Sequence, residues 1–246
     1  ADESVVDELS EIVVLFYSPD LWLTSQTFEQ AVSTENNMFI VGNEIIQALE
    51  VEYLDENLWA LRRLIRGIRG TEWAMYTHEV GERAVLFNDA AVQRVAILET
   101  AINTMIDTQT ISQGSELGVA TTEVLDFKAN HLRPFAPGYA HVSRDVSGNL
   151  TFDLVPRARH NGVWLSGSET VSDQDTREYE IEIWTGNHIS GTGSVVRTIT
   201  LEDTEAVSYS AANQTTDFGS VQSSVKVRIY QIGTLIGRGF PRYATI

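Results

Sequence analysis

The stretch REYEIEIW, residues 177–184, alternates polar and apolar side chains from Glu178 to Ile183. In an extended strand, successive side chains point to opposite faces, so this pattern places one set in a core and the other in water. We expect the apolar set to be buried and the acidic set to face solvent: Tyr179, Ile181 and Ile183 inside, Glu178, Glu180 and Glu182 outside. The stretch therefore predicts a half-buried β-strand.

The same alternation recurs in NLTFDLV (149–155) and SVKVRIY (224–230), and further strand patterns cover 194–201, 206–210 and 243–246. Turn signals rich in Gly, Asn and Asp separate them, among them residues 191–193 and 217–219. Short strands at regular spacing, divided by such turns, predict a β-sandwich.

The first half of the chain is less regular. The apolar run 12–17 predicts a buried strand, and residues 24–32 predict a short helix capped by Thr24 or Ser25. Further strand-like segments are 38–41, 44–53, 58–65, 83–87 and 101–111. These patterns indicate a small, mainly β domain with one or two short helices.

Two prolines and a glycine in LRPFAPG, residues 132–138, predict an extended, helix-free linker. We place the domain boundary there, with a β-rich domain over 1–132 and the sandwich over 133–246. The fold class is mainly β.

The composition limits the classes of function. A formal net charge of −17 argues against direct binding of nucleic acid, because phosphate contacts need clustered Lys or Arg. The absence of cysteine removes disulfides and thiolate chemistry. No apolar run approaches the ~20 residues of a membrane helix, and the acidic N-terminus does not resemble a secretory signal. Since the chain has no initiator Met, we expect that it is either processed or a piece of a longer protein.

The search for catalytic patterns predicts no enzyme: it assigns no catalytic, cofactor-binding or metal-ligating residue. The sequence contains neither Gly-x-Ser-x-Gly nor HExxH. Pairs of acidic residues do not indicate a glycosidase here, because a chain with thirty-four Asp and Glu residues contains such pairs by chance. The histidines show no metal-ligand spacing and are expected in turns or on the surface: His78, His131, His141, His160 and His188.

Three residues are candidates for an interface or receptor contact. Arg66 and Arg69 belong to a basic cluster with Arg62 and Arg63. The cluster would grip an acidic neighbour or a polysaccharide, or it would pair with Glu50, Glu52 or Glu72 inside the fold. Trp164 would stack on a sugar ring, or it would cap one end of the sandwich. The glutamates of 178–182 would form a solvated face or, alternatively, contribute to a Ca²⁺ site.

Two segments resemble a known family. LIRGIRGTEWA (64–74), followed by His78, GER (81–83) and VLF (85–87), is similar to a signature of the large tail-tip or baseplate proteins of siphophages and of gene transfer agents of alphaproteobacteria. From 132 to 246, LRP, YEIEI, DFGS, VRIYQ and the closing GRGFP follow in that family's order. The resemblance covers roughly residues 35 to 246 and is to the C-terminal part of these megatron or host-specificity proteins.

The resemblance implies a virion structural protein at the distal end of a tail, with a hub or tip domain followed by a fibronectin type III-like domain. It implies contacts with other tail-tip proteins, copies arranged as a trimer or ring about the tail axis, and a role in host attachment. Where such domains usually carry a Trp on the second strand, this chain has Phe152 and Leu154. An adhesin module that binds host polysaccharide is the alternative.

Overall fold

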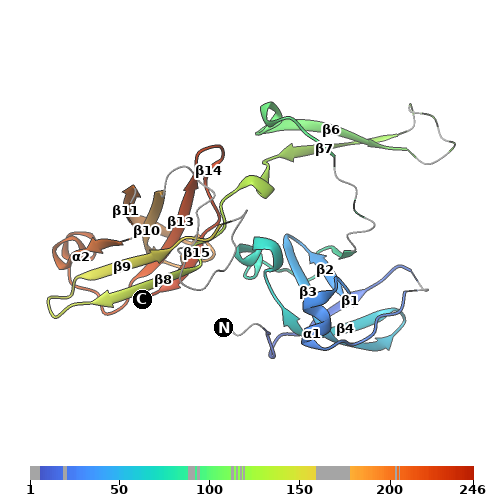
Figure 1. The fold of residues 1–246 in the computed structure, drawn as a ribbon, viewed down its shortest axis with the longest axis horizontal. Coiled ribbons are helices and arrows are strands. Elements are labelled where there is room, and N and C mark those ends of the chain that lie inside the picture. The colour runs from blue at the N-terminus through green and yellow to red at the C-terminus, as the bar shows by residue number, and fades with distance from the viewer. Residues whose placement is uncertain are drawn as a thin grey trace.

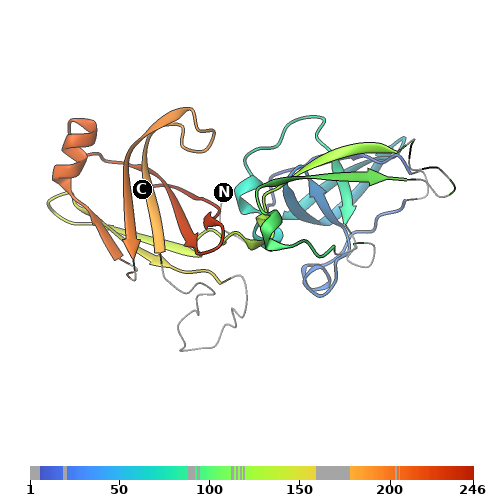
Figure 2. The ribbon, with the colours of Figure 1, turned by 90° about the horizontal axis from the view of Figure 1, so that it is seen from above.

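The computed structural model describes residues 6–18, 21–87, 92, 95–111, 114, 116, 118, 120–158, 178–202, 204 and 206–246. Over these residues the protein is mainly β and consists of a first domain, a hairpin arm and a sandwich domain (Figure 1). Figure 2 shows the first domain and the sandwich as two bodies that follow one another along the long axis. None of the described helices has the length and apolar composition that a membrane crossing would require.

The first domain is built on an antiparallel sheet with the strand order β1-β4-β3-β2-β5. Its strands are β1 (Ile12–Leu15), β2 (Met38–Val41), β3 (Glu44–Asp55), β4 (Leu58–Ile65) and β5 (Ala84–Phe87). Glu56 and Asn57 form the β3–β4 turn, as expected, and both have positive φ. The core of the domain comes from alternate residues of β3 and β4 together with β1, β2 and Leu23. The expected strands at 38–41, 44–53, 58–65 and 83–87 are thus confirmed.

The helix of this domain begins later than predicted. Helix α1 spans Phe28–Ser33, and Thr27 caps it in a capping box with Gln30. The prediction of a start at Thr24 or Ser25 is wrong because the preceding residues bond to β3: Ser25 Oγ accepts from Val51 N, and Gln26 N donates to Leu49 O. Two 3₁₀ turns, η1 (Ile68–Gly70) and η2 (Glu72–Ala74), follow β4.

The hairpin arm consists of β6 (Thr104–Thr110) and β7 (Thr121–Phe127), preceded by the turn η4 (Glu99–Ala101). The two strands pair with each other in register from Thr104↔Phe127 to Thr110↔Thr121 and form a sheet of their own. Almost every described side chain of the arm is exposed on both faces. Strand β7 had no counterpart in the sequence prediction, and β6 begins three residues after the expected Ala101.

The segment between arm and sandwich is packed rather than free. After the turn η6 (Asn130–Leu132), residues 133–138 contain no helix or strand, as expected for the double-proline segment. Pro134, Ala136 and Pro137 are nevertheless buried. The prolines therefore shape a joint between the two domains rather than a loose tether.

The second domain is a fibronectin type III-like β-sandwich. One sheet has the order β12-β9-β8, with β8 (Tyr139–Arg144), β9 (Leu150–Val155) and β12 (Ala206–Tyr209). The other has the order β11-β10-β13, where β14 and β15 both pair with β13. Its strands are β10 (Glu178–Gly186), β11 (Gly193–Glu202), β13 (Lys226–Gly233), β14 (Gly237–Arg238) and β15 (Arg242–Thr245). Phe152 and Leu154 are fully buried between the sheets.

The opening strand pattern is confirmed on its apolar side and corrected on its acidic side. Tyr179, Ile181 and Ile183 are at most 1% exposed. Glu182, however, is buried, because Arg238, Trp184 Nε1 and Tyr230 Oη donate hydrogen bonds to its carboxylate. The expected solvated acidic face is therefore covered at this position by polar and aromatic side chains from β10, β13 and β14.

Residues 217–219, predicted as a turn between strands, end a helix. Helix α2 spans Ala211–Phe218, with Ser210 as its N-cap and Gly219 in the left-handed conformation at its C-cap. Its sequence AANQTTDF contains mostly weak helix formers, so propensity alone did not reveal it. Gln214 on its buried side donates to Gly148 O and Tyr209 O, which fixes the helix to the end of the sandwich.

Candidate functional site

The segments that carry the family resemblance meet in space, between the first domain and the sandwich. We call this contact the junction, and we define it by Gly70, Trp73, Phe135, Arg157 and Phe240. The rings of Trp73 and Phe240 lie parallel at an interplanar angle of 2°, with centroids 5.1 Å apart. A stacked pair of this kind joins the 3₁₀ turn after β4 to the residues between β14 and β15.

Gly70 lets the backbone of the first domain approach the joint segment. It has φ +85°, and a Cβ at this position would collide with the ring of Phe135. An L side chain at Gly70 would therefore be strained by its backbone conformation and would displace Phe135. The glycines of the RGIRGTEW motif therefore allow the backbone to pack closely against Phe135 and Glu72.

Arg157 holds the sandwich side of the junction. Its guanidinium pairs with Glu72 and lies 4.8 Å from the centroid of the Phe135 ring. Its backbone N–H donates to Gln231 Oε1 (2.7 Å), and its carbonyl accepts from Gln231 Nε2 (3.0 Å). The contact thus combines one ion pair, two aromatic contacts and a buried amide, so it constrains the orientation of one domain on the other.

A second group of residues, which we call the Glu44 cluster, lies inside the first domain. The Glu44 side chain is fully buried and accepts from Arg66 Nε (2.8 Å) and Nη2 (2.7 Å) and from Gly67 N (2.7 Å). His78 Nε2 lies 2.6 Å from the same carboxylate, and His78 Nδ1 contacts Glu82. The cluster ties the start of β3 to the segment that follows β4.

The cluster shifts the pKa of His78. Burial alone would lower the pKa, but hydrogen bonds and charge interactions with Glu44 and Glu82 outweigh burial and raise it above the usual value of 6.5. The surroundings of His78 therefore favour the charged imidazolium more than water does. His78 is thus not the solitary surface histidine that the sequence suggested. His188 lies in a turn, as expected, but is only 5% exposed.

Arg66 and Arg69 lie in different surroundings. The Arg66 side chain is 12% exposed and is held by Glu44 and by Asp7, whose Oδ2 lies 3.2 Å from Arg66 Nη1. The guanidinium of Arg66 is thus already bound by two carboxylates and exposes little surface. Arg69 is partly exposed, pairs with Glu35 and lies 5.0 Å from the centroid of the Phe87 ring. Trp164 falls outside the described residues.

The other arginines of the basic cluster pair with acids of the first domain. Arg62 lies between Glu11 and Glu52, and its Nη1 is 2.5 Å from Glu52 Oε2. Arg63 makes a two-point contact with Glu8. Glu50 is 4.0 Å from Arg62, whereas Glu72, the third expected partner, pairs with Arg157 of the sandwich instead. The pairing interpretation of the cluster is thus the one that the structure favours.

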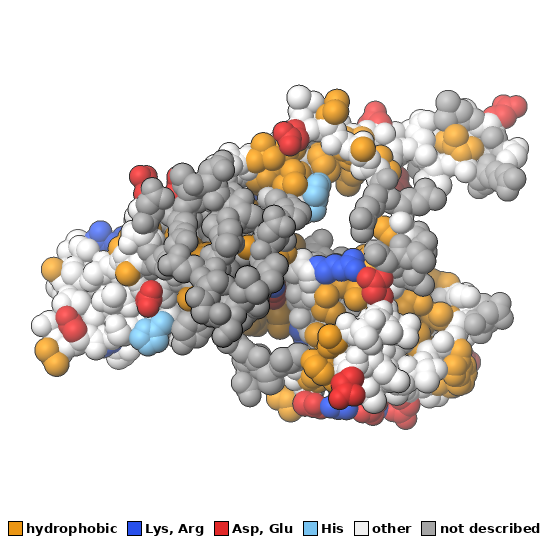
Figure 3. Space-filling view, viewed as in Figure 1, with side chains coloured by type: hydrophobic (Ala, Val, Ile, Leu, Met, Phe, Trp, Pro, Cys, Tyr) orange, Lys and Arg blue, Asp and Glu red, His pale blue; other side chains and the backbone are white. Residues whose placement is uncertain are grey.

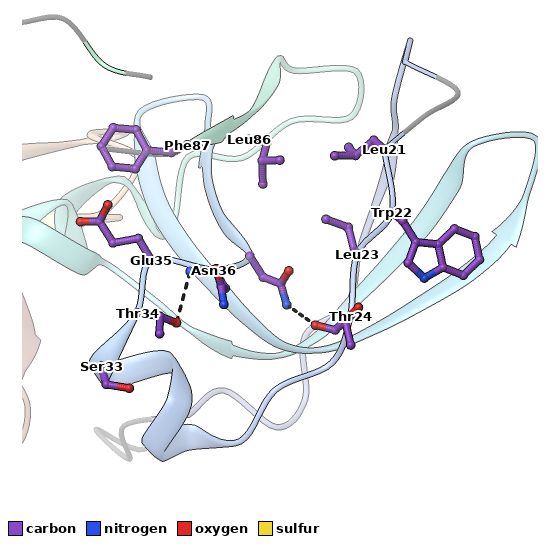
Figure 4. A pocket seen from close by; sticks show the side chains of 11 residues that line it. Leu21, Trp22, Leu23, Thr24, Ser33, Thr34, Glu35, Asn36, Leu86 and Phe87 are labelled. Carbon is purple, nitrogen blue, oxygen red and sulfur yellow. Dashed lines mark hydrogen bonds between the residues drawn. The ribbon is translucent and has the colours of Figure 1, made fainter. Parts of the chain in front are cut away.

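A shallow groove of about 660 Å³ opens beside β5 (Figure 4). Leu21, Leu23 and Leu86 converge on it, and Phe87 closes one end. Its rim is polar: Asn37 Nδ2 donates to Thr24 O (2.9 Å), and Asn36 N donates to Thr34 Oγ1. In the described part of the chain no group of three or more His, Asp or Glu side chains is arranged to hold a metal ion. The groove is therefore lined mainly by polar groups, with leucines and Phe87 on one side.

Glu44, Phe135 and Phe240 were missed as candidates from the sequence. The available signals were local: Glu44 opens an otherwise apolar run, NEIIQAL, and both phenylalanines lie in words with Pro and Gly, RPFAPG and GRGFPR. A carboxyl in an apolar strand needs a buried partner. That partner, Arg66, lies twenty-two residues away, so only the tertiary structure identifies it.

Comparison with known proteins adds a partial match. A family model described as Rcc01698-like, C-terminal, matches residues 1–85 of the 246. No curated protein matches the chain. Among solved structures, the rat CD45 extracellular region, domains d3–d4, matches with 17% identity and a TM-score of 0.33 over 66% of this chain and 72% of that one. A likeness of that extent does not bear on what this chain does.

Proposed function

We propose that this chain is a structural component of the tail tip or baseplate of a phage or phage-like particle, contributing to tail assembly and host attachment. Its neighbours would be other tail-tip proteins and further copies of itself around the tail axis. In this proposal the chain has no catalytic role. Its work is to hold a fixed geometry and to offer surfaces to its neighbours.

The observation that carries the proposal is the hairpin arm. An isolated two-stranded hairpin is marginal in water, and support from a third strand or a packed face is normally needed. Within the described residues the arm pairs with neither domain, and it exposes Met105 (67%), Val124 (62%) and Leu125 (47%). Such an element is expected to be stabilised by contacts with neighbouring subunits in an assembly.

The junction supports the same proposal in a different way. The motif residues that resemble the tail-tip family, Gly70, Trp73 and Phe240 among them, are used for packing between domains. Arg66 of the same word is used inside the first domain. Residues that set geometry rather than chemistry are what a structural component of a tail requires.

Localisation on purified particles tests the proposal. An epitope tag inserted in the β8–β9 turn at Val146, which is fully exposed, would be detected by gold-labelled antibody in electron micrographs. We expect label at the tail end distal to the capsid. Label on the capsid, or particles without label despite expression of the tagged chain, would refute the proposal.

One observation favours a second candidate function, the binding of a surface polysaccharide. Trp22 is 72% exposed and stacks on Tyr53 at 5.8 Å, with Trp59 edge-on beneath at 5.2 Å. An exposed, firmly held indole is a suitable platform for a sugar ring. Binding to host polysaccharide that is lost in Trp22→Ala and kept in Tyr17→Ala would support it; equal binding by both variants would exclude this platform.

A further inference from the structure

The hairpin arm and strand β5 are two incomplete surfaces of the same chain. Strand β5 is an edge strand: it pairs with β2 on one side and with no other described strand. Val85 and Leu86 on it are 41% and 36% exposed. An open edge with apolar side chains is a template for the addition of another strand.

We infer that the arm of one copy docks on the β5 edge of a second copy, adding its strands to that copy's five-stranded sheet. This inference rests on the part of the proposed function that brings several copies together around one axis. The occupant of the β5 edge is thus another copy of this chain, and β7 is the strand that meets it.

Side-chain complementarity supports this pairing. On one face of the arm Ile106 lies directly opposite Leu125, and Phe127 follows two residues later. At the β5 edge Val85 and Leu86 are the exposed apolar side chains, and Leu86 also lines the groove beside it (Figure 4). Figure 3 shows hydrophobic side chains gathered along the arm at the top of the view. The exposed apolar side chains of the arm would thus meet those of the β5 edge.

Charge supports the same pairing. The arm carries Asp107, Glu123 and Asp126, and all three are exposed. Arg83, also exposed, comes directly before β5. At the opposite edge of the same sheet Glu11 comes directly before β1, and Arg62 already pairs with it. The opposite charge at the β5 edge therefore favours β5 as the docking edge.

The order of the elements in the chain explains why the partner is another copy arranged in a ring. The arm follows β5 in sequence, so an arm donated to a neighbour leaves the donor's own edge open for the arm of the preceding copy. Such a head-to-tail contact uses two different patches on each subunit. It closes into a ring when the rotation between copies permits.

Cysteine cross-linking tests the inference, and the chain is well suited to it because it contains no cysteine. Leu86→Cys and, separately, Glu123→Cys, Val124→Cys or Leu125→Cys are made in differently tagged full chains, which are mixed and oxidised. We expect a disulfide between the two tagged chains for at least one β7 position. Leu86→Cys mixed with Val146→Cys, an exposed site on the sandwich, is the matched control and should give no more than background.

A second measurement keeps the inference testable if the oxidised product is scarce. Light scattering of the unmodified chain should show concentration-dependent association, weakened about tenfold by Leu125→Asp and unchanged by Val146→Asp. A chain that stays monomeric at millimolar concentration would overturn the inference. So would a disulfide within one chain in the double variant Leu86→Cys/Leu125→Cys at monomer mass, because the arm would then close on its own domain. Neither result would affect the localisation of the chain on particles.

Discussion

The two domains are both antiparallel β structures, but they are held together differently. The sandwich core is apolar and comes from strands with regular alternation, such as β9, β10 and β13. The first domain has an apolar core too, but beside it stands a fully buried carboxylate with an arginine and a histidine. The sandwich buries Glu182 as well, but its strands keep a regular alternation. The difference teaches that a regular period-two pattern identifies a sandwich directly, whereas the less regular strands of the first domain hide its organisation from pattern analysis.

The largest effect should come from removing the buried carboxylate. Glu44→Ala leaves Arg66 largely buried without its main partner, and breaking a buried pair in this way costs about 3–5 kcal/mol. We expect hydrogen exchange in β3 and β4 to become faster, with β10 and β13 little changed. The control Glu50→Ala removes a half-exposed acid 4.0 Å from Arg62 and should leave exchange unaltered. A loss of stability no larger than in the control would contradict the role of the cluster.

The second largest loss of stability should come from truncating a core residue of the sandwich. Ile181→Ala removes a fully buried side chain between the two sheets, which costs about 2–5 kcal/mol. Here exchange in β10 and β13 should accelerate while β3 and β4 stay protected. Val195→Ala, on the neighbouring strand β11 and 40% exposed, is the matched control. If Ile181→Ala destabilised both domains equally, the comparison between two separately stabilised cores would fail.

A smaller effect is expected at the junction. Trp73→Ala removes the ring stacked on Phe240, a pair worth about 0.5–1.5 kcal/mol beyond its buried area. Since the pair joins the domains, thermal unfolding should separate more clearly into two transitions, which calorimetry would resolve. Tyr17→Ala, at a side chain that is 96% exposed, serves as the control. An unchanged profile in Trp73→Ala would show that the domains are not coupled through this contact.

The smallest expected effect is a difference between the two domains in how their stability depends on pH. The pKa of His78 is raised, so its contribution to the stability of the first domain is present below about 6.5 and is lost as the pH rises through the raised value. Burial, together with the charges of Lys226 and Arg228, lowers the pKa of His188, so the sandwich gains stability as the pH rises from this lowered value to about 6.5.

Hydrogen exchange between pH about 5 and 8, corrected for the intrinsic rate, should therefore show the sandwich gaining protection up to about 6.5 and the first domain losing protection above that pH. The variant His78→Gln should flatten the trend in the first domain, and His141→Gln, at an exposed position of β8, should not. Parallel trends in both domains would show that other groups control the pH dependence.

Much of the architecture could be predicted from local pattern. The strands from β2 to β5 and most of the sandwich strands follow from alternation and turn residues, because a half-buried strand imposes period two on its sequence. Helix α1 was displaced by the bonds of Ser25 and Gln26 to β3, and α2 was missed because its stability comes from packing and capping rather than propensity. Glu182 was expected in water because alternation does not report what lies above a sheet face.

Less of the candidate site could be predicted from the sequence. The words RGIRGTEW and GRGFP were recognised as distinctive, yet their meaning depends on a contact between Trp73 and Phe240, which are far apart in the chain. Arg66 was expected either at an interface or paired with Glu50, Glu52 or Glu72, and its partner is Glu44. Side-chain types limit which partners are suitable, but long-range packing decides which partner is present.

The sequence by itself determined the class of fold and the acidic and cysteine-free character, because composition and periodicity are local properties. Only the tertiary structure decided that Glu44 is buried against Arg66, that Glu72 pairs across the junction with Arg157, and that no other described strand pairs with the strands of the arm. These are contacts between distant residues, and their free energy depends on distance, burial and geometry that no local pattern contains.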